Sequence, residues 1–102
     1  MQDYIVRLVL STHPGGEHAP KEFERLVATG VSPRAGQALT AAARILALID
    51  GRFAVAVSDV TRVLRPVFRH RILRTFEADS DGIDGDALVG RLLEHVPRVG
   101  SD

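Results

Sequence analysis

Apolar residues recur at helical spacing along most of this 102-residue chain. Near the amino terminus the i, i+3, i+4, i+7 pattern is met by Ile5, Leu8, Val9 and Thr12. Asp3 is a candidate N-cap for this first helix. A His-Pro-Gly-Gly turn over residues 13–16 should end it, because proline and paired glycines extend a helix poorly.

Two further helices are expected before residue 51. One should open near Pro20, stop at Gly30 and bury Phe23, Leu26 and Val27. The next has Ser32 as a candidate N-cap and Pro33 as its first residue, and it should run to Asp50. Its apolar face comprises Ala35, Leu39, Ala42, Ala43, Leu46 and Ile49. Small alanines allow close approach, so we expect this to be the central helix of a bundle.

The second half of the chain alternates connectors and helices. Residues 52–57 are β-prone but short, and they predict an extended connector. A fourth helix should follow, kinked by Pro66, with an apolar face of Val60, Val63, Leu64, Val67 and Phe68. Residues 72–76 fit either an extended segment or a frayed helix end, and residues 79–85 form a polar loop.

Asp84 is a candidate cap for a last helix that Pro97 should end. Its apolar face comprises Leu88, Val89, Leu92, Leu93 and Val96. We expect residues 98–102 to be a disordered tail, which leaves one domain over residues 1–97. The pattern as a whole predicts an all-α fold, a small bundle of four to five helices.

Composition excludes several classes of protein. Hydrophobic residues make up 45% and charged residues 25%, with a formal net charge of +0, as in ordinary globular domains. The chain has no cysteine, which excludes disulfides and thiolate zinc sites. No apolar run reaches the ~20 residues of a membrane span, and the amino terminus lacks a signal-peptide pattern, so a cytoplasmic location is expected. No phosphate-binding loop or hydrolase motif is present, so the chain alone should not be an enzyme.

Two segments imitate metal sites. His13, Glu17 and His18 supply two imidazoles and a carboxylate within six residues, but their spacing matches no standard zinc pattern. The acidic stretch 77–82 resembles the start of a calcium loop, but Leu88 stands where a bidentate glutamate is needed. We interpret the first as a turn and the second as a solvated loop, and we expect no metal site.

The basic run is the third candidate for function, and it comprises Arg62, Arg65, Arg69, Arg71 and Arg74. The first three share a helical face, which fits either a nucleic-acid or acidic-partner surface or simply the wet side of an amphipathic helix. Only Phe68 and Phe76 could stack on bases, and both are plausible core residues. A stand-alone interaction or nucleic-acid-binding module using this face is therefore the alternative function, with nucleic acid not favoured.

The sharpest feature is the hexapeptide at residues 30–35, Gly-Val-Ser-Pro-Arg-Ala. It places Arg34 in the first turn of a helix, where free amides and a partial positive charge attract anions. A guanidinium adds a planar, permanently charged donor fork. Arg34 could equally be an exposed arginine at a helix start, and spacing alone leaves both interpretations open.

This hexapeptide resembles the sensor-2 motif of MoxR-family AAA+ ATPases. The similarity continues in order along the chain, through residues 4–9, 12–14, 41–52 and 59–71. Two segments depart from the family pattern. Residues 56–60 replace a usual Thr-Pro-x-Asp-Val, with Ser58 as a substitute cap, and Asp84-Gly85-Asp86 replaces a more helix-favouring start.

The resemblance implies the lid domain of such an ATPase. Arg34, positioned by Ser32 and Pro33, would be the nucleotide-binding sensor of the γ-phosphate. ATP and Mg²⁺ would bind in an AAA+ core domain of the same polypeptide, and the isolated chain would bind neither tightly. The family further implies a chaperone-like role, neighbouring subunits of a hexamer, and a von Willebrand factor A-domain protein as a partner.

Overall fold

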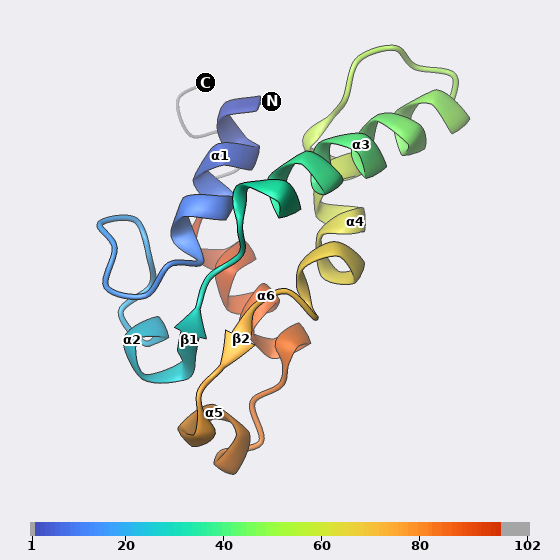
Figure 1. Cartoon of the computed structure of the whole chain (residues 1–102). Helices are drawn as coiled ribbons and strands as arrows, with labels where there is room; N and C mark the ends of the chain where they lie inside the picture. Colours follow the sequence, from blue (N-terminus) through green and yellow to red (C-terminus); the bar gives the residue numbers. More distant parts are fainter. Residues whose placement is uncertain (1, 97–102) are drawn as a thin grey trace.

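A computed structural model describes residues 2–96, which form a helical body with one small sheet (Figure 1). In chain order the elements are α1 (Gln2–Ser11), α2 (Phe23–Leu26), β1 (Val27–Thr29), α3 (Pro33–Ile49), α4 (Val57–Phe68), β2 (Leu73–Arg74), α5 (Phe76–Ser80) and α6 (Gly85–His95). The all-α class is confirmed over this range. Here no helix is long and apolar enough to cross a membrane. Pro97 and the predicted tail lie outside the described residues.

The first helix ends where the sequence predicts, but its cap differs. α1 stops at Ser11, and the following turn uses a left-handed Gly15 with φ of 78°. Asp3 lies within the first turn instead of preceding it, so its prediction as the N-cap is wrong. A carboxylate in the first turn still interacts favourably with the helix dipole.

The predicted second helix is wrong in length. α2 has only four residues, and the backbone becomes extended at Val27, where φ is −115° and ψ is 123°. β1 then pairs antiparallel with β2, with Val27 opposite Arg74 and Thr29 opposite Leu73. The extended alternative for residues 73 and 74 is thereby confirmed. Helical periodicity could not reveal this pairing, because its two strands lie far apart in sequence.

α4 begins differently from the prediction. It starts at Val57, so Ser58 lies in its first turn and is not the cap. The carboxylate of Asp59 instead accepts the backbone N–H of Ala56, at 2.8 Å. Pro66 lies inside the helix, which continues to Phe68. Asp59 therefore fixes the residue that precedes α4, where the alanine side chain itself offers no capping group.

The last two helices are both capped by side chains. Thr75 Oγ1 accepts the N–H of Ala78 at 3.1 Å, which starts α5, and the last two residues of this helix, Asp79 and Ser80, lie in what was predicted to be a loop. Asp84 accepts the N–H of Ala87 at 2.9 Å, as predicted for the last helix. The unusual start of α6 therefore still forms a capped helix.

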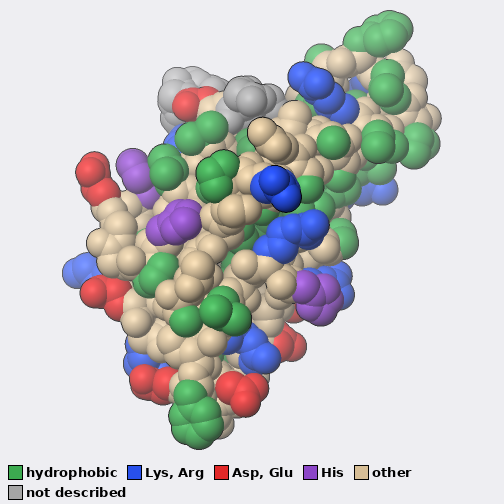
Figure 2. All heavy atoms as spheres, viewed as in Figure 1, with side chains coloured by type: hydrophobic (Ala, Val, Ile, Leu, Met, Phe, Trp, Pro, Cys, Tyr) green, Lys and Arg blue, Asp and Glu red, His purple; other side chains and the backbone are tan. Residues whose placement is uncertain are grey.

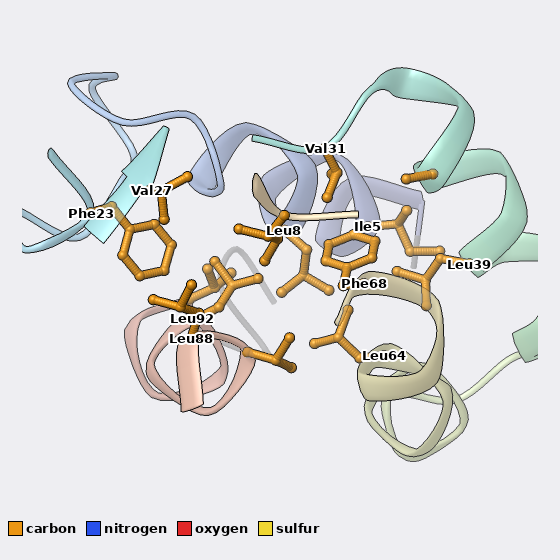
Figure 3. Packing of buried hydrophobic residues seen from close by; sticks show 14 of the residues in the cluster. Ile5, Leu8, Phe23, Val27, Val31, Leu39, Leu64, Phe68, Leu88 and Leu92 are labelled. Atoms are coloured by element: carbon orange, nitrogen blue, oxygen red, sulfur yellow. The ribbon is translucent and has the colours of Figure 1, made fainter. Parts of the chain in front are cut away.

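The core lies among α1, α3, α4 and α6, with Phe23 and Val27 closing the end near the sheet (Figure 3). Its largest fully buried side chains include Tyr4, Leu8, Leu39, Leu64, Phe68, Leu88 and Leu92. Burying one such Leu or Phe side chain contributes roughly 1.5–3 kcal/mol. Packing of these side chains against one another therefore holds the helices in their arrangement.

α3 packs against both α1 and α4, so its predicted central position is confirmed. Its predicted apolar face holds only in part. Ala35, Leu39 and Ala43 are buried, but Ile49 is 76% exposed. The reason is that the carboxy-terminal half of α3 projects beyond the other helices (Figure 1).

Candidate functional site

The segment leading into α3 is fixed by the end of α1. Thr12 is fully buried, and its hydroxyl donates to the carbonyl of Val9 at 2.6 Å. The same Oγ1 accepts the backbone N–H of Val31 at 3.0 Å. A Cβ on Gly30 would come within 2.7 Å of Thr12 O and Oγ1, so only glycine fits there. The start of α3 therefore has a fixed position relative to α1.

The amino terminus of α3 lies at the surface of the lid. Ser32 is extended, with φ of −79° and ψ of 165°, and its side chain makes no capping hydrogen bond. Pro33 is the first helical residue, and no acidic residue lies in the first turn. Ser32, Pro33 and Arg34 are all exposed. The arrangement is suited to an anion, because the positive end of the helix dipole and an exposed guanidinium lie at the same end of the helix.

Arg34 makes no ion pair or side-chain hydrogen bond with any residue from 2 to 96. Other arginines of the described chain, such as Arg25 and Arg52, are engaged by carboxylates. Arg34 can therefore bind an external anion without breaking an internal contact.

An apolar groove adjoins this helix start. It lies between α1 and α3, has a volume of about 290 Å³, and is lined by Ile5, Val6, Val9, Leu10, Pro33, Gly36, Gln37 and Thr40. Gly36 contributes to the close packing, because a Cβ there would meet the side chain of Val9 at 3.0 Å. The site thus combines a cationic helix end with an apolar surface beside it.

A second polar cluster lies near the other end of α3. Arg52 donates from Nη1 to Asp59 Oδ2 at 2.8 Å and from Nη2 to Asp59 Oδ1 at 2.7 Å. The guanidinium, with the N–H of Ala56, lowers the pKa of Asp59 to about 2. The same bonds raise the pKa of Arg52. Sequence reasoning missed this pair, although an acid three residues after a helix cap is a recognisable signal.

A protein-family model described as the AAA lid domain matches residues 21–92. The chain belongs to this family. Chaperone MoxR1 of Mycobacterium tuberculosis is 39% identical over 94 residues, which cover 92% of this chain and 25% of that protein. Protein MoxR of Paracoccus denitrificans is 54% identical over 48 residues, which cover 47% of this chain and 14% of that protein.

A solved structure shows the same fold. It is a protein of Cytophaga hutchinsonii, provisionally named an ATPase, with 27% identity and a TM-score of 0.88. The match covers 94% of this chain and 29% of that one. Together these similarities make the chain an AAA+ lid of the MoxR type, and it spans a quarter of the length of the mycobacterial relative.

Most of the basic run of the lid makes internal contacts. Arg69 lies 3.4 Å from Asp86, and Arg74 lies 3.3 Å from Asp79 while also donating to the carbonyl of Ile83. The run therefore does not form a uniform cationic face, which weakens the nucleic-acid interpretation.

The two aromatic residues near this run differ. Phe68 is in the core as expected, whereas Phe76 is 86% exposed and its prediction as a core residue is wrong. Phe76 belongs to the first turn of α5, which lies at the edge of the lid (Figure 1). One exposed ring cannot supply the successive stacking platforms that single-stranded nucleic acid requires.

The metal-like segments have other contacts. Among residues 2–96 no group of three or more histidine and carboxylate side chains could hold a metal ion. The backbone carbonyl of His18 lies 2.9 Å from His95 Nε2. In the acidic stretch, Glu77 and Asp81 both pair with Arg25, at 3.0 and 2.8 Å. These carboxylates thus serve to join α2 to α5.

Proposed function

We propose that this lid senses the nucleotide of a MoxR-type AAA+ ATPase, with Arg34 binding the γ-phosphate. The observation that carries the proposal is an exposed arginine at an uncapped helix start whose backbone is fixed by Thr12. A guanidinium favours ATP over ADP, because only ATP has a γ-phosphate that can accept its charge-assisted hydrogen bond. Ser32 and Pro33 position Arg34 by setting where α3 begins.

The longer protein is here called the parent ATPase. We propose that residues 1–97 form its lid, and that an AAA+ core of the same polypeptide binds ATP and Mg²⁺. The lid would close over the nucleotide, exclude water and couple hydrolysis to movement. A chaperone-like activity is part of the proposal and is supported by the name of the mycobacterial relative, Chaperone MoxR1. A hexameric assembly in the cytoplasm and a von Willebrand factor A-domain partner complete the proposal, as the MoxR resemblance implies.

The test is steady-state ATP turnover by the parent ATPase. Arg34→Ala should lower turnover about tenfold or more, because one charge-assisted contact to the transferred phosphate is lost. Arg34→Lys should recover only part of the rate, since an ammonium lacks the planar donor fork. Arg71→Ala is the control, because this exposed arginine lies in the turn after α4 and its loss should leave turnover unchanged. Equal turnover in wild type and Arg34→Ala, with normal assembly, would refute the assignment.

A further inference from the structure

One buried hydroxyl connects the end of α1 to the segment that leads into α3. Thr12 is completely buried, and its Oγ1 acts both as a donor and as an acceptor, as a single hydroxyl can. It donates to the carbonyl of Val9 at 2.6 Å and accepts the backbone N–H of Val31 at 3.0 Å. Arg34 lies three residues beyond Val31, so this contact sets the point from which the chain enters the helix that carries the proposed sensor.

Within the described chain the N–H of Val31 depends on this hydroxyl. Val31 is 1% exposed, and its side chain points into the core (Figure 3). A buried donor without a partner costs more free energy than a typical hydrogen bond contributes. Without the hydroxyl the backbone at Val31 would therefore shift until its N–H meets water or another acceptor. The carbonyl of Val9 would stay paired, because it also accepts the N–H of Thr12 at 3.1 Å.

The backbone of the segment between β1 and α3 also lies directly against Thr12. A Cβ on Gly30 would come within 2.7 Å of both the carbonyl oxygen and Oγ1 of Thr12, so the two backbones are already as close as they can be. The far end of the segment is held by the sheet, where Val27 lies opposite Arg74. The position of the residues that enter α3 is therefore set at Thr12.

Arg34 depends on its backbone alone for its position. Its side chain is exposed and makes no ion pair or side-chain hydrogen bond with any residue from 2 to 96. Figure 2 shows basic side chains at the surface near the start of α3. The body of the helix is held separately, since Ala35 and Leu39 are buried in the core. Loss of the Thr12 hydroxyl should therefore leave the lid folded and displace the first turn of α3.

We propose that Thr12 is a positioning residue for the γ-phosphate sensor, and that its hydroxyl sets how strongly the parent ATPase prefers ATP to ADP. The inference rests on the proposed function, since Thr12 acts only through Arg34. A guanidinium distinguishes the two nucleotides only while its donor fork meets the γ-phosphate oxygens at hydrogen-bond distance. A displaced first turn of α3 weakens that contact, and it leaves ADP unaffected because ADP has no γ-phosphate.

The test is equilibrium binding of a non-hydrolysable ATP analogue and of ADP by the parent ATPase. Thr12→Val keeps the shape of the side chain but removes the hydroxyl. It should weaken binding of the analogue by about threefold or more and leave ADP unchanged, because a misplaced donor keeps only part of a charge-assisted bond. Thr12→Ser keeps the hydroxyl and should retain most of the preference for the analogue. Equal losses for both nucleotides, no loss, or a Thr12→Ser variant as impaired as Thr12→Val would overturn the proposal.

Gly30→Ala tests the same contact without removing the hydroxyl. Its Cβ would press against Thr12 and displace the segment, so the preference for the analogue should fall in the same way. This variant gives an answer even if Thr12→Val does not fold. A loss of affinity shared equally by the analogue and ADP would again contradict the positioning role.

Thr61→Val is the matched control. The Thr61 hydroxyl also donates to a carbonyl three residues earlier, that of Ser58 at 3.1 Å, but it lies on α4. This substitution should change neither affinity, and a change equal to that of Thr12→Val would contradict the proposal.

A double-mutant cycle separates this inference from the proposed function. In an Arg34→Ala background Thr12→Val should have no further effect on the preference for the analogue, because the two residues act as one unit. A further loss of the same size there would overturn the inference. An unchanged preference in Arg34→Ala would overturn the proposed function and this inference with it. A reduced preference in Arg34→Ala with an unchanged one in Thr12→Val would overturn this inference alone.

Discussion

At the scale of single residues, Asp59 shows how one buried carboxylate organises a surface loop. It accepts two hydrogen bonds from Arg52 and one from the backbone of Ala56. Its negative charge is balanced by the Arg52 guanidinium and by three hydrogen bonds in all, so its burial does not leave an unpaired ion. The same contacts hold Arg52 and Ala56, the residues on either side of the exposed Phe53.

This arrangement predicts a specific dependence of stability on pH. The pKa of Asp59 falls from 3.8 to about 2 on folding. Because the folded value is lower, the stabilisation is complete above about pH 4 and disappears as pH falls towards 2. The free energy of unfolding of wild type and of Asp59→Asn should be measured by urea unfolding. The difference between the two should become smaller as pH falls from about 4 towards 2.

Asp79→Asn is the control for that experiment, because Asp79 forms an exposed pair with Arg74. Exposed ion pairs contribute less than about 1 kcal/mol, so the free energy of unfolding of Asp79→Asn should stay close to that of wild type at every pH in the range. A gap for Asp59→Asn that stays constant from pH 6 to pH 2 would contradict the role assigned to this carboxylate.

At the scale of elements, α3 has two halves with different surroundings. Leu39 in the first half is completely buried, whereas Leu48 in the second is more than half exposed. In the 102-residue chain Leu39→Ala should lower the free energy of unfolding by about 2–5 kcal/mol. Leu48→Ala should change it by less than about 0.5 kcal/mol. Chemical denaturation of both variants tests the two expectations. A large loss of stability in Leu48→Ala would mean that Leu48 is packed within the lid itself.

The sequence predicted those features of the elements that depend on near neighbours. The starts of α3 at Pro33 and α6 after Asp84 follow from local capping and helical propensity. The strand at Val27 could not be predicted in the same way, because it depends on Arg74 across the sheet. Tertiary pairing overrode helical periodicity there.

The same distinction between local and tertiary features applies to the candidate site. Arg34 was identifiable because residues 30–35 resemble a known motif, and the structure adds the role of Thr12 in fixing Val31. The pairing of Arg52 with Asp59 was not identified, although both residues lie in segments that resemble the family. The exposure of Ile49 was not predicted, because periodicity marks this residue as apolar without showing that α3 extends beyond its neighbours.

At the scale of the whole molecule, one helix, α3, has exposed residues of different character at its two ends. Arg34 lies in the first turn of α3, and the exposed Ile49 is its last residue. α3 packs against α1 and α4, and these contacts fix its direction. If the lid moves with the nucleotide as proposed, both ends of α3 would move together, because α3 is one continuous helix.

The central claim is that Arg34 distinguishes ATP from ADP, and the most direct measurement compares their affinities. Equilibrium binding of a non-hydrolysable ATP analogue and of ADP should be measured on the parent ATPase and on its Arg34→Ala variant. The account predicts that the variant loses about tenfold or more in affinity for the analogue and almost nothing for ADP. Equal losses for both nucleotides, or an unchanged preference, would contradict it.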